Sequence, residues 1–132
     1  MAEGKLLLRN VRILVADDSH EQASLLGIIL TNQGAVVEIV SGGAKAVSKA
    51  MEKSYDVIVL DLEMMSMGGI EATIMLRVQG YDKPIIAITA HPRPEHDKLT
   101  EHGFDDFLRK PIDPTTLIAA VARLVGKPAG PS

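Results

Sequence analysis

Five short apolar segments, each followed by a stretch with helical patterning, constrain this chain more than any other feature. The clearest spans residues 57–60 and runs directly into Asp61. A continuous apolar run this short is typical of a strand buried on both faces, as in the middle of a parallel sheet covered by helices. The other segments span residues 11–16, 35–40, 84–89 and 106–108. We therefore expect an α/β fold, with a five-stranded parallel sheet, right-handed crossovers and helices on both faces.

Helix start signals support this alternation. Ser19, with Gln22 three positions later, is a capping-box pattern, and Gly34 follows as a helix-ending glycine. Asp113 before Pro114 gives a helix cap followed by proline at the first helical position. The patterning predicts helices over residues 19–33, 44–54, 70–79, 94–100 and 114–125. We expect a lead or linker at 1–9, one domain at 10–126 and a tail or linker at 127–132.

Composition narrows the possible functions. The 132 residues include no cysteine, which excludes disulfides and thiolate metal sites and favours a cytoplasmic setting. The net charge is −3 and no long basic run occurs, which argues against direct binding of nucleic acid. No apolar stretch approaches the length of a membrane span, and the amino terminus lacks a secretory pattern. We expect no membrane contact by this domain.

Polar side chains stand where the predicted strands end. They are Asp17, Asp18, Asp61, Thr89 and Lys110. In a parallel sheet the carboxyl ends of the strands meet at one edge, so we expect these groups to gather there. Like charges about 4 Å apart repel by about 4 kcal/mol at an effective dielectric constant of 20, so three carboxylates need a cationic partner. Lys110 supplies one positive charge, and a divalent ion bound by oxygen ligands would supply more.

The ligand types in this cluster indicate a particular chemistry. Cysteine is missing and the histidines are scattered, so an oxygen-only site suits Mg²⁺, with Mn²⁺ as a possible substitute, better than zinc or iron. Mg²⁺ accompanies phosphoryl groups, and a carboxylate such as Asp61 can itself be the nucleophile that forms an aspartyl phosphate. A lysine and a hydroxyl, as in Lys110 and Thr89, would stabilise the new phosphoryl oxygens.

The type, order and spacing of these residues resemble those of the receiver domains of two-component response regulators. The match rests on acidic residues after the first strand, Asp61 ending the third, Thr89-Ala90 ending the fourth and Lys110-Pro111 after the fifth. It covers residues 12–125 and implies a (βα)5, flavodoxin-like, doubly wound fold. Residues 103–112 and 69–72 are most similar to receivers of hybrid sensor histidine kinases.

The resemblance implies a role for each acidic residue. Asp61 would accept a phosphoryl group from the phosphohistidine of a histidine kinase or a histidine phosphotransfer domain. Asp18 and the backbone carbonyl of Glu63 would bind Mg²⁺ directly. Asp61 belongs to the same ligand set, and Asp17 would act largely through water. The domain itself would then be a phosphoacceptor rather than a turnover enzyme, although its parent protein can be a histidine kinase.

The resemblance also implies a switch. Lys110 would pair with the phosphoryl group, and Thr89 would turn inward to donate a hydrogen bond to it. Phe107 matches the family's aromatic switch position and would swing inward with Thr89. The bond between Lys110 and Pro111 is expected to be cis, a form that only X-Pro bonds adopt at low cost.

Several positions depart from the family or tune it. Met65 stands where the family has proline and Gly68 where it has aspartate, which predicts a less rigid loop after Asp61. Glu63 and His91, two positions after Asp61 and Thr89, are expected to tune the access of water to the acyl phosphate.

Alternatives remain open at this point. The chain would be the receiver segment of a hybrid histidine kinase or a free-standing response regulator. An aspartate-nucleophile phosphohydrolase would need a second aspartate where Glu63 stands, and a nucleotide-binding module would need a glycine-rich or hydroxyl-rich loop where the first acidic pair stands. A degenerate receiver would serve only for docking.

Ile28 and Leu30 lie outside the expected core stripe of the first helix and are candidates for a partner surface.

Overall fold

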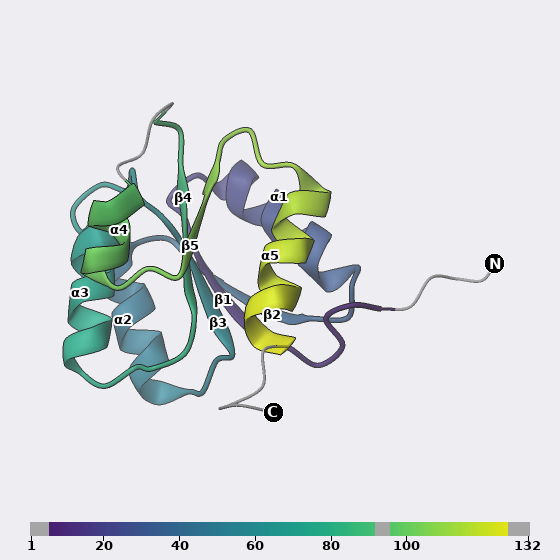
Figure 1. Cartoon of the computed structure of the whole chain (residues 1–132), viewed down its shortest axis with the longest axis horizontal. Coiled ribbons are helices and arrows are strands. Elements are labelled where there is room, and N and C mark those ends of the chain that lie inside the picture. The colour runs from purple at the N-terminus through teal and green to yellow at the C-terminus, as the bar shows by residue number, and fades with distance from the viewer. Residues whose placement is uncertain (1–5, 92–95, 127–132) are drawn as a thin grey trace.

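The computed structural model describes residues 6–91 and 96–126, and these form a parallel sheet with helices on both faces (Figure 1). The strands are β1 (Arg12–Ala16), β2 (Val36–Val40), β3 (Val57–Asp61), β4 (Ile85–Thr89) and β5 (Asp106–Arg109). The helices are α1 (His20–Thr31), α2 (Gly43–Glu52), α3 (Gly69–Val78), α4 (His96–His102) and α5 (Pro114–Gly126). The strand order is β2-β1-β3-β4-β5, with every neighbouring pair parallel. This is the flavodoxin-like order, and it confirms the expected fold class.

The sheet separates two apolar cores. Helices α1 and α5 cover one face and helices α2, α3 and α4 cover the other, as Figure 1 shows. In β3, Val57 and Val59 pack into the first core, whereas Ile58 and Leu60 pack into the second. Alternate residues therefore face opposite layers, and both layers need apolar side chains. This explains why residues 13–16 of β1, 57–60 of β3 and 85–88 of β4 are all apolar rather than alternating.

The helix start signals are confirmed, with one correction. The Ser19 side chain caps α1 by accepting a hydrogen bond from the backbone N–H of Gln22, and Asp113 Oδ2 accepts one from the N–H of Thr116 at the start of α5. The reciprocal half of the capping box is wrong. The N–H of Ser19 donates to Asp17 Oδ1 at 2.9 Å, because that carboxylate lies two residues away at the strand end.

The Arg77 side chain connects α3 to the loops before β4 and β5 through hydrogen bonds. Its guanidinium donates to the backbone carbonyls of Gly103, Tyr81 and Lys83 over distances of 2.7 to 3.1 Å. It also forms an ion pair with Asp105 at 3.0 Å. The side chain is 26% exposed, so these bonds are only partly open to competition from water. The sequence carries no local signal for this contact, because Arg77 and Gly103 are 26 residues apart.

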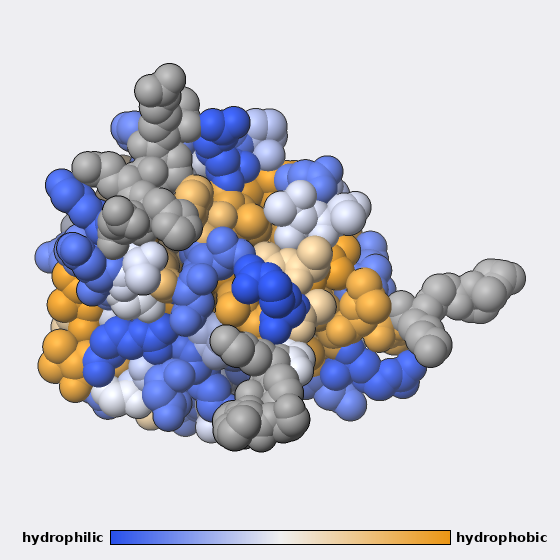
Figure 2. Space-filling view, viewed as in Figure 1, coloured by the Kyte–Doolittle hydropathy of each residue, from blue (hydrophilic) through white to orange (hydrophobic). Residues whose placement is uncertain are grey.

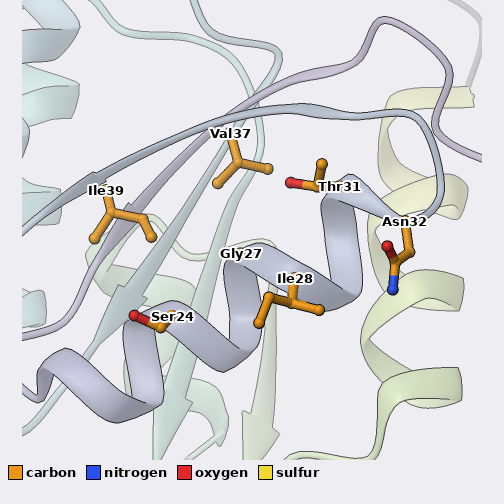
Figure 3. Close-up of a pocket in the computed structure, with 7 residues that line it drawn as sticks. All are labelled: Ser24, Gly27, Ile28, Thr31, Asn32, Val37 and Ile39. Atoms are coloured by element: carbon orange, nitrogen blue, oxygen red, sulfur yellow. The ribbon is translucent and has the colours of Figure 1, made fainter.

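The surface of α1 differs from its prediction. Leu30 is fully buried in the core beside β1, so its assignment to a partner surface is wrong, whereas Ile28 is 60% exposed. Ile28 lines a groove of about 480 Å³ between α1 and the edge strand β2 (Figure 3). The groove residues are Ser24, Gly27, Ile28, Thr31, Asn32, Val37 and Ile39. Other apolar surface lies over α3, visible at the left of Figure 2. At the end of that helix Val78 is 80% exposed.

Some predictions fall outside the described part of the chain. The tail at 127–132, most of the lead at 1–9 and the first residues of the helix predicted at 94–100 belong to this group. The described part of that helix runs from His96 to His102, two residues beyond its predicted end. Among the described helices, none combines the length and apolar character needed to span a membrane.

Candidate functional site

Three carboxylates meet at the carboxyl edge of the sheet. Asp17, Asp18 and Asp61 each offer an oxygen, and these oxygens all lie within 4.8 Å of one another. Asp17 and Asp61 are each only 2% exposed, whereas Asp18 is exposed. They come together because β1 and β3 are adjacent and parallel, with Ala16 opposite Leu60. The sequence prediction that the strand ends gather these groups is correct for this trio.

Backbone N–H groups hold the three carboxylates in place, that of Asp17 through the bond from Ser19 described above. Asp61 Oδ1 accepts from the N–H of Glu63 at 2.9 Å, and Asp18 Oδ2 accepts from the N–H of Met65, also at 2.9 Å. The loop after β3 therefore wraps over the acidic cluster and connects it to β1. These backbone donors were not predicted, because they depend on the loop conformation rather than on residue type.

The cluster fits a hard divalent cation. Asp17 Oδ2 is buried and has no hydrogen-bond partner among the described residues. Burial, together with the nearby charge of Asp61, raises the pKa of Asp17 from 3.8 to about 6, against the lowering effect of its bond from Ser19. An unpartnered buried carboxylate oxygen beside two further carboxylates is the donor set expected for an oxygen-ligated ion. Asp18 and Met65 also line a cavity of about 340 Å³, which opens one side of the cluster at Asp18.

Among the described residues, Lys110 supplies the positive charge that contacts this site. Its ammonium Nζ lies 2.9 Å from Asp61 Oδ2 and 3.9 Å from Glu63 Oε1. Burial alone would lower the pKa of Lys110, but its hydrogen bond to Asp61 and the surrounding negative charge outweigh that effect and raise the pKa. The peptide bond between Lys110 and Pro111 is cis, as expected. Lys110 is therefore a charged partner that is held against the buried carboxylate of Asp61.

Glu63 connects Thr89 to this cluster in a way that was not predicted. The Thr89 hydroxyl donates to Glu63 Oε2 at 2.5 Å, and the backbone N–H of Ala90 donates to Glu63 Oε1 at 2.8 Å. The strand register offered a signal for this contact. Asp61 pairs with Ile88, so continuing both chains by two residues places Glu63 beside Ala90.

The remaining candidates lie around this core. The N–H of His91 donates to Thr89 Oγ1 at 3.0 Å, and the residue is exposed. Phe107 is half-buried and packs against the core beneath α2, α3 and α4. The roles expected of these two residues, and of the Glu63 carbonyl as a metal ligand, stay predictions.

Comparison with known proteins identifies the family. A family model for the response regulator receiver domain matches residues 13–122. The sensor protein GacS of Pseudomonas syringae pv. syringae is 33% identical over 124 residues, which are 89% of this chain and 14% of GacS. An uncharacterized 14.6 kDa protein of Leptolyngbya boryana is 34% identical over 117 residues, covering 86% of this chain and 89% of that protein.

A solved structure agrees with the sequence matches. The receiver domain of the sensor histidine kinase PA1611 from Pseudomonas aeruginosa PAO1, described with a magnesium ion in its active-site cleft, superposes with a TM-score of 0.83 at 28% identity. The match covers 89% of this chain and 99% of that domain. Fold, strand-end residues and family model agree. The chain belongs to the response regulator receiver domain family.

Proposed function

We propose that this receiver domain is a phosphoacceptor switch in a two-component phosphorelay, with Asp61 as the phosphorylated residue. The observation that carries the proposal is the contact between Lys110 Nζ and Asp61 Oδ2 at 2.9 Å, beside the carboxylates of Asp17 and Asp18. Of the three carboxylates, Asp61 is the one that Lys110 contacts. Lys110 is therefore placed to stabilise a phosphoryl group that forms there.

A bound Mg²⁺, or Mn²⁺ in its place, would neutralise the carboxylates and the incoming phosphoryl oxygens. Asp18, Asp61 and the Glu63 carbonyl would hold the ion, with Asp17 acting largely through water. The buried Asp17 Oδ2, which accepts no hydrogen bond from the described residues, supports such a ligand set. A magnesium ion is described in the cleft of the PA1611 receiver, and the same ion suits the oxygen donors here.

The transfer itself needs little from the protein beyond position and charge. One carboxylate oxygen of Asp61 bonds to phosphorus, the P–N bond of a phosphohistidine breaks, and the electron pair returns to the imidazole nitrogen. Lys110 stabilises the phosphoryl oxygens during the transfer, and the Thr89 hydroxyl donates a hydrogen bond to the phosphoryl group of the product. Movement of Thr89 and Phe107 would then shift the conformation that a partner recognises. Glu63 and His91 would tune hydrolysis of the acyl phosphate.

Intact-mass measurement after incubation with acetyl phosphate tests this function. Wild type with Mg²⁺ should gain one phosphoryl group, whereas the Asp61→Asn variant and wild type in EDTA should gain none. Asp82→Asn, which removes a negative charge from an exposed loop at the opposite edge of the sheet, is the matched control and should be phosphorylated like wild type. A phosphoryl group on Asp61→Asn would contradict the assignment.

We further propose that the domain is the cytoplasmic receiver segment of a hybrid histidine kinase and receives its phosphoryl group from a kinase or phosphotransfer domain. The similarity to GacS supports this origin, although the chain spans only 14% of GacS. The match over 89% of the short Leptolyngbya protein favours a free-standing response regulator instead. An immunoblot of the source cells with antibody to this domain separates the two. A band far above 14.2 kDa supports the hybrid kinase, and a band at that mass supports the free-standing protein.

A further inference from the structure

The Glu63 carboxylate is held by three positive or hydrogen-donating groups that come from two other strand ends. Its two oxygens accept from the Thr89 hydroxyl and the Ala90 N–H, and Lys110 Nζ lies 3.9 Å from Oε1. The Glu63 side chain is 46% exposed, so burial does not force it into this position. Its own N–H donates to Asp61, which anchors the backbone beneath it. The carboxylate is therefore drawn in by these donors.

A phosphoryl group on Asp61 would need the same donors. Besides the ammonium group of Lys110, the Thr89 hydroxyl and the Ala90 N–H are described donors at this strand edge that do not hold one of the three aspartates. A phosphoryl dianion depends on charge-assisted hydrogen bonds of this kind. It also repels a carboxylate at short range. Glu63 and the phosphoryl group therefore compete for one set of donors.

We propose that the Glu63 carboxylate is an internal anion that occupies the phosphoryl-binding donors in the unphosphorylated protein and must be displaced when Asp61 is modified. This rests on the proposed function of Asp61. It makes Glu63 a positioning residue that already holds the Thr89 hydroxyl toward the site before any phosphoryl group arrives. It also lowers the affinity of the site for a phosphoryl-like anion, because each binding event must break the Glu63 contacts.

Binding of beryllofluoride with Mg²⁺, followed by fluorine NMR, tests the competition directly. Beryllofluoride bonds to a carboxylate oxygen as an analogue of its acyl phosphate. Because a hydrogen bond to a charged group is worth about one to two powers of ten in an equilibrium constant, Glu63→Gln and Glu63→Ala should bind beryllofluoride about tenfold or more tightly than wild type. Glu52→Gln, an equal charge change at the last residue of α2, should bind like wild type.

A second readout separates competition from a general structural effect. The amide resonance of Ala90 in nitrogen-proton spectra should shift in Glu63→Ala without ligand, and should become similar to wild type once beryllofluoride is bound. Equal or weaker beryllofluoride affinity in both Glu63 variants would overturn the competition while leaving the role of Asp61 intact. Absence of binding in wild type and in every variant would overturn the proposed function, and this inference with it.

Discussion

Asp17→Asn should stabilise the metal-free protein, which is unusual for a change at a buried position. The Asp17 and Asp61 oxygens lie within 4.8 Å, and two unit charges at that distance repel by about 3.5 kcal/mol at an effective dielectric constant of 20. Lys110 offsets part of this repulsion, so we expect a gain of about 1 to 2 kcal/mol. The asparagine oxygen can still accept the hydrogen bond that Asp17 Oδ1 receives from Ser19.

The same substitution should have the opposite effect when Mg²⁺ is present. A ligand at about 100 times its dissociation constant stabilises the native state by about 2.7 kcal/mol. The free energy of unfolding of wild type should rise by this amount in Mg²⁺, whereas that of Asp17→Asn should rise much less. Urea denaturation in EDTA and in Mg²⁺ measures both effects. Asp82→Asn controls for net charge and should stay within about 0.5 kcal/mol of wild type in both buffers. A less stable Asp17→Asn in EDTA, or an equal gain from Mg²⁺ in both proteins, would refute the reasoning.

Three further outcomes follow from the geometry. Because burial raises the pKa of Asp17 to about 6, calorimetry should show Mg²⁺ affinity falling below that pH by up to about tenfold per pH unit and levelling off above it. Arg77→Ala should lower the free energy of unfolding, measured by urea denaturation, by about 2 kcal/mol, because three backbone carbonyls lose a charged hydrogen-bond donor. An unchanged free energy of unfolding would show that water replaces the guanidinium as donor. Gly43→Ala should lower the stability of the protein by about 1 to 3 kcal/mol in thermal unfolding, because the added Cβ would lie 2.5 Å from the Met67 carbonyl oxygen. Gly42→Ala is the matched control: its Cβ would meet no atom within 4 Å, so the loss of stability should be smaller.

The sheet and its acidic edge could be predicted because they follow from local patterns. Each apolar run is short and continuous, and a parallel sheet brings all strand ends to one side whatever the loops do. That rule places Asp17, Asp18, Asp61 and Lys110 together from their positions in the chain alone. The start of α5 at Pro114 was equally local, since proline fits the first helical position.

The contacts and the burial that the sequence did not predict depend on loop conformation and on how the helices pack against the sheet. The strand register brings Glu63 beside Ala90, but the hydrogen bonds of its carboxylate depend on the loop after β3, in which Ser66 has a positive φ of 64° that no sequence pattern predicted. Leu30 is buried because α1 lies against both the sheet and α5, so its apolar face is wider than one stripe. Arg77 contacts Gly103 and Asp105, which are 26 and 28 residues away, and these contacts exist only once the layers have packed.

The most direct test of the central claim is to locate the acyl phosphate. After phosphorylation with acetyl phosphate and Mg²⁺, borohydride reduces an acyl phosphate on an aspartate to homoserine, and peptide mass spectrometry then identifies the modified residue. Homoserine is expected at position 61 alone, with no product when Mg²⁺ is withheld. Reduction at Asp17, Asp18 or Glu63 in place of Asp61, or none at any of them in phosphorylated protein, would contradict that claim.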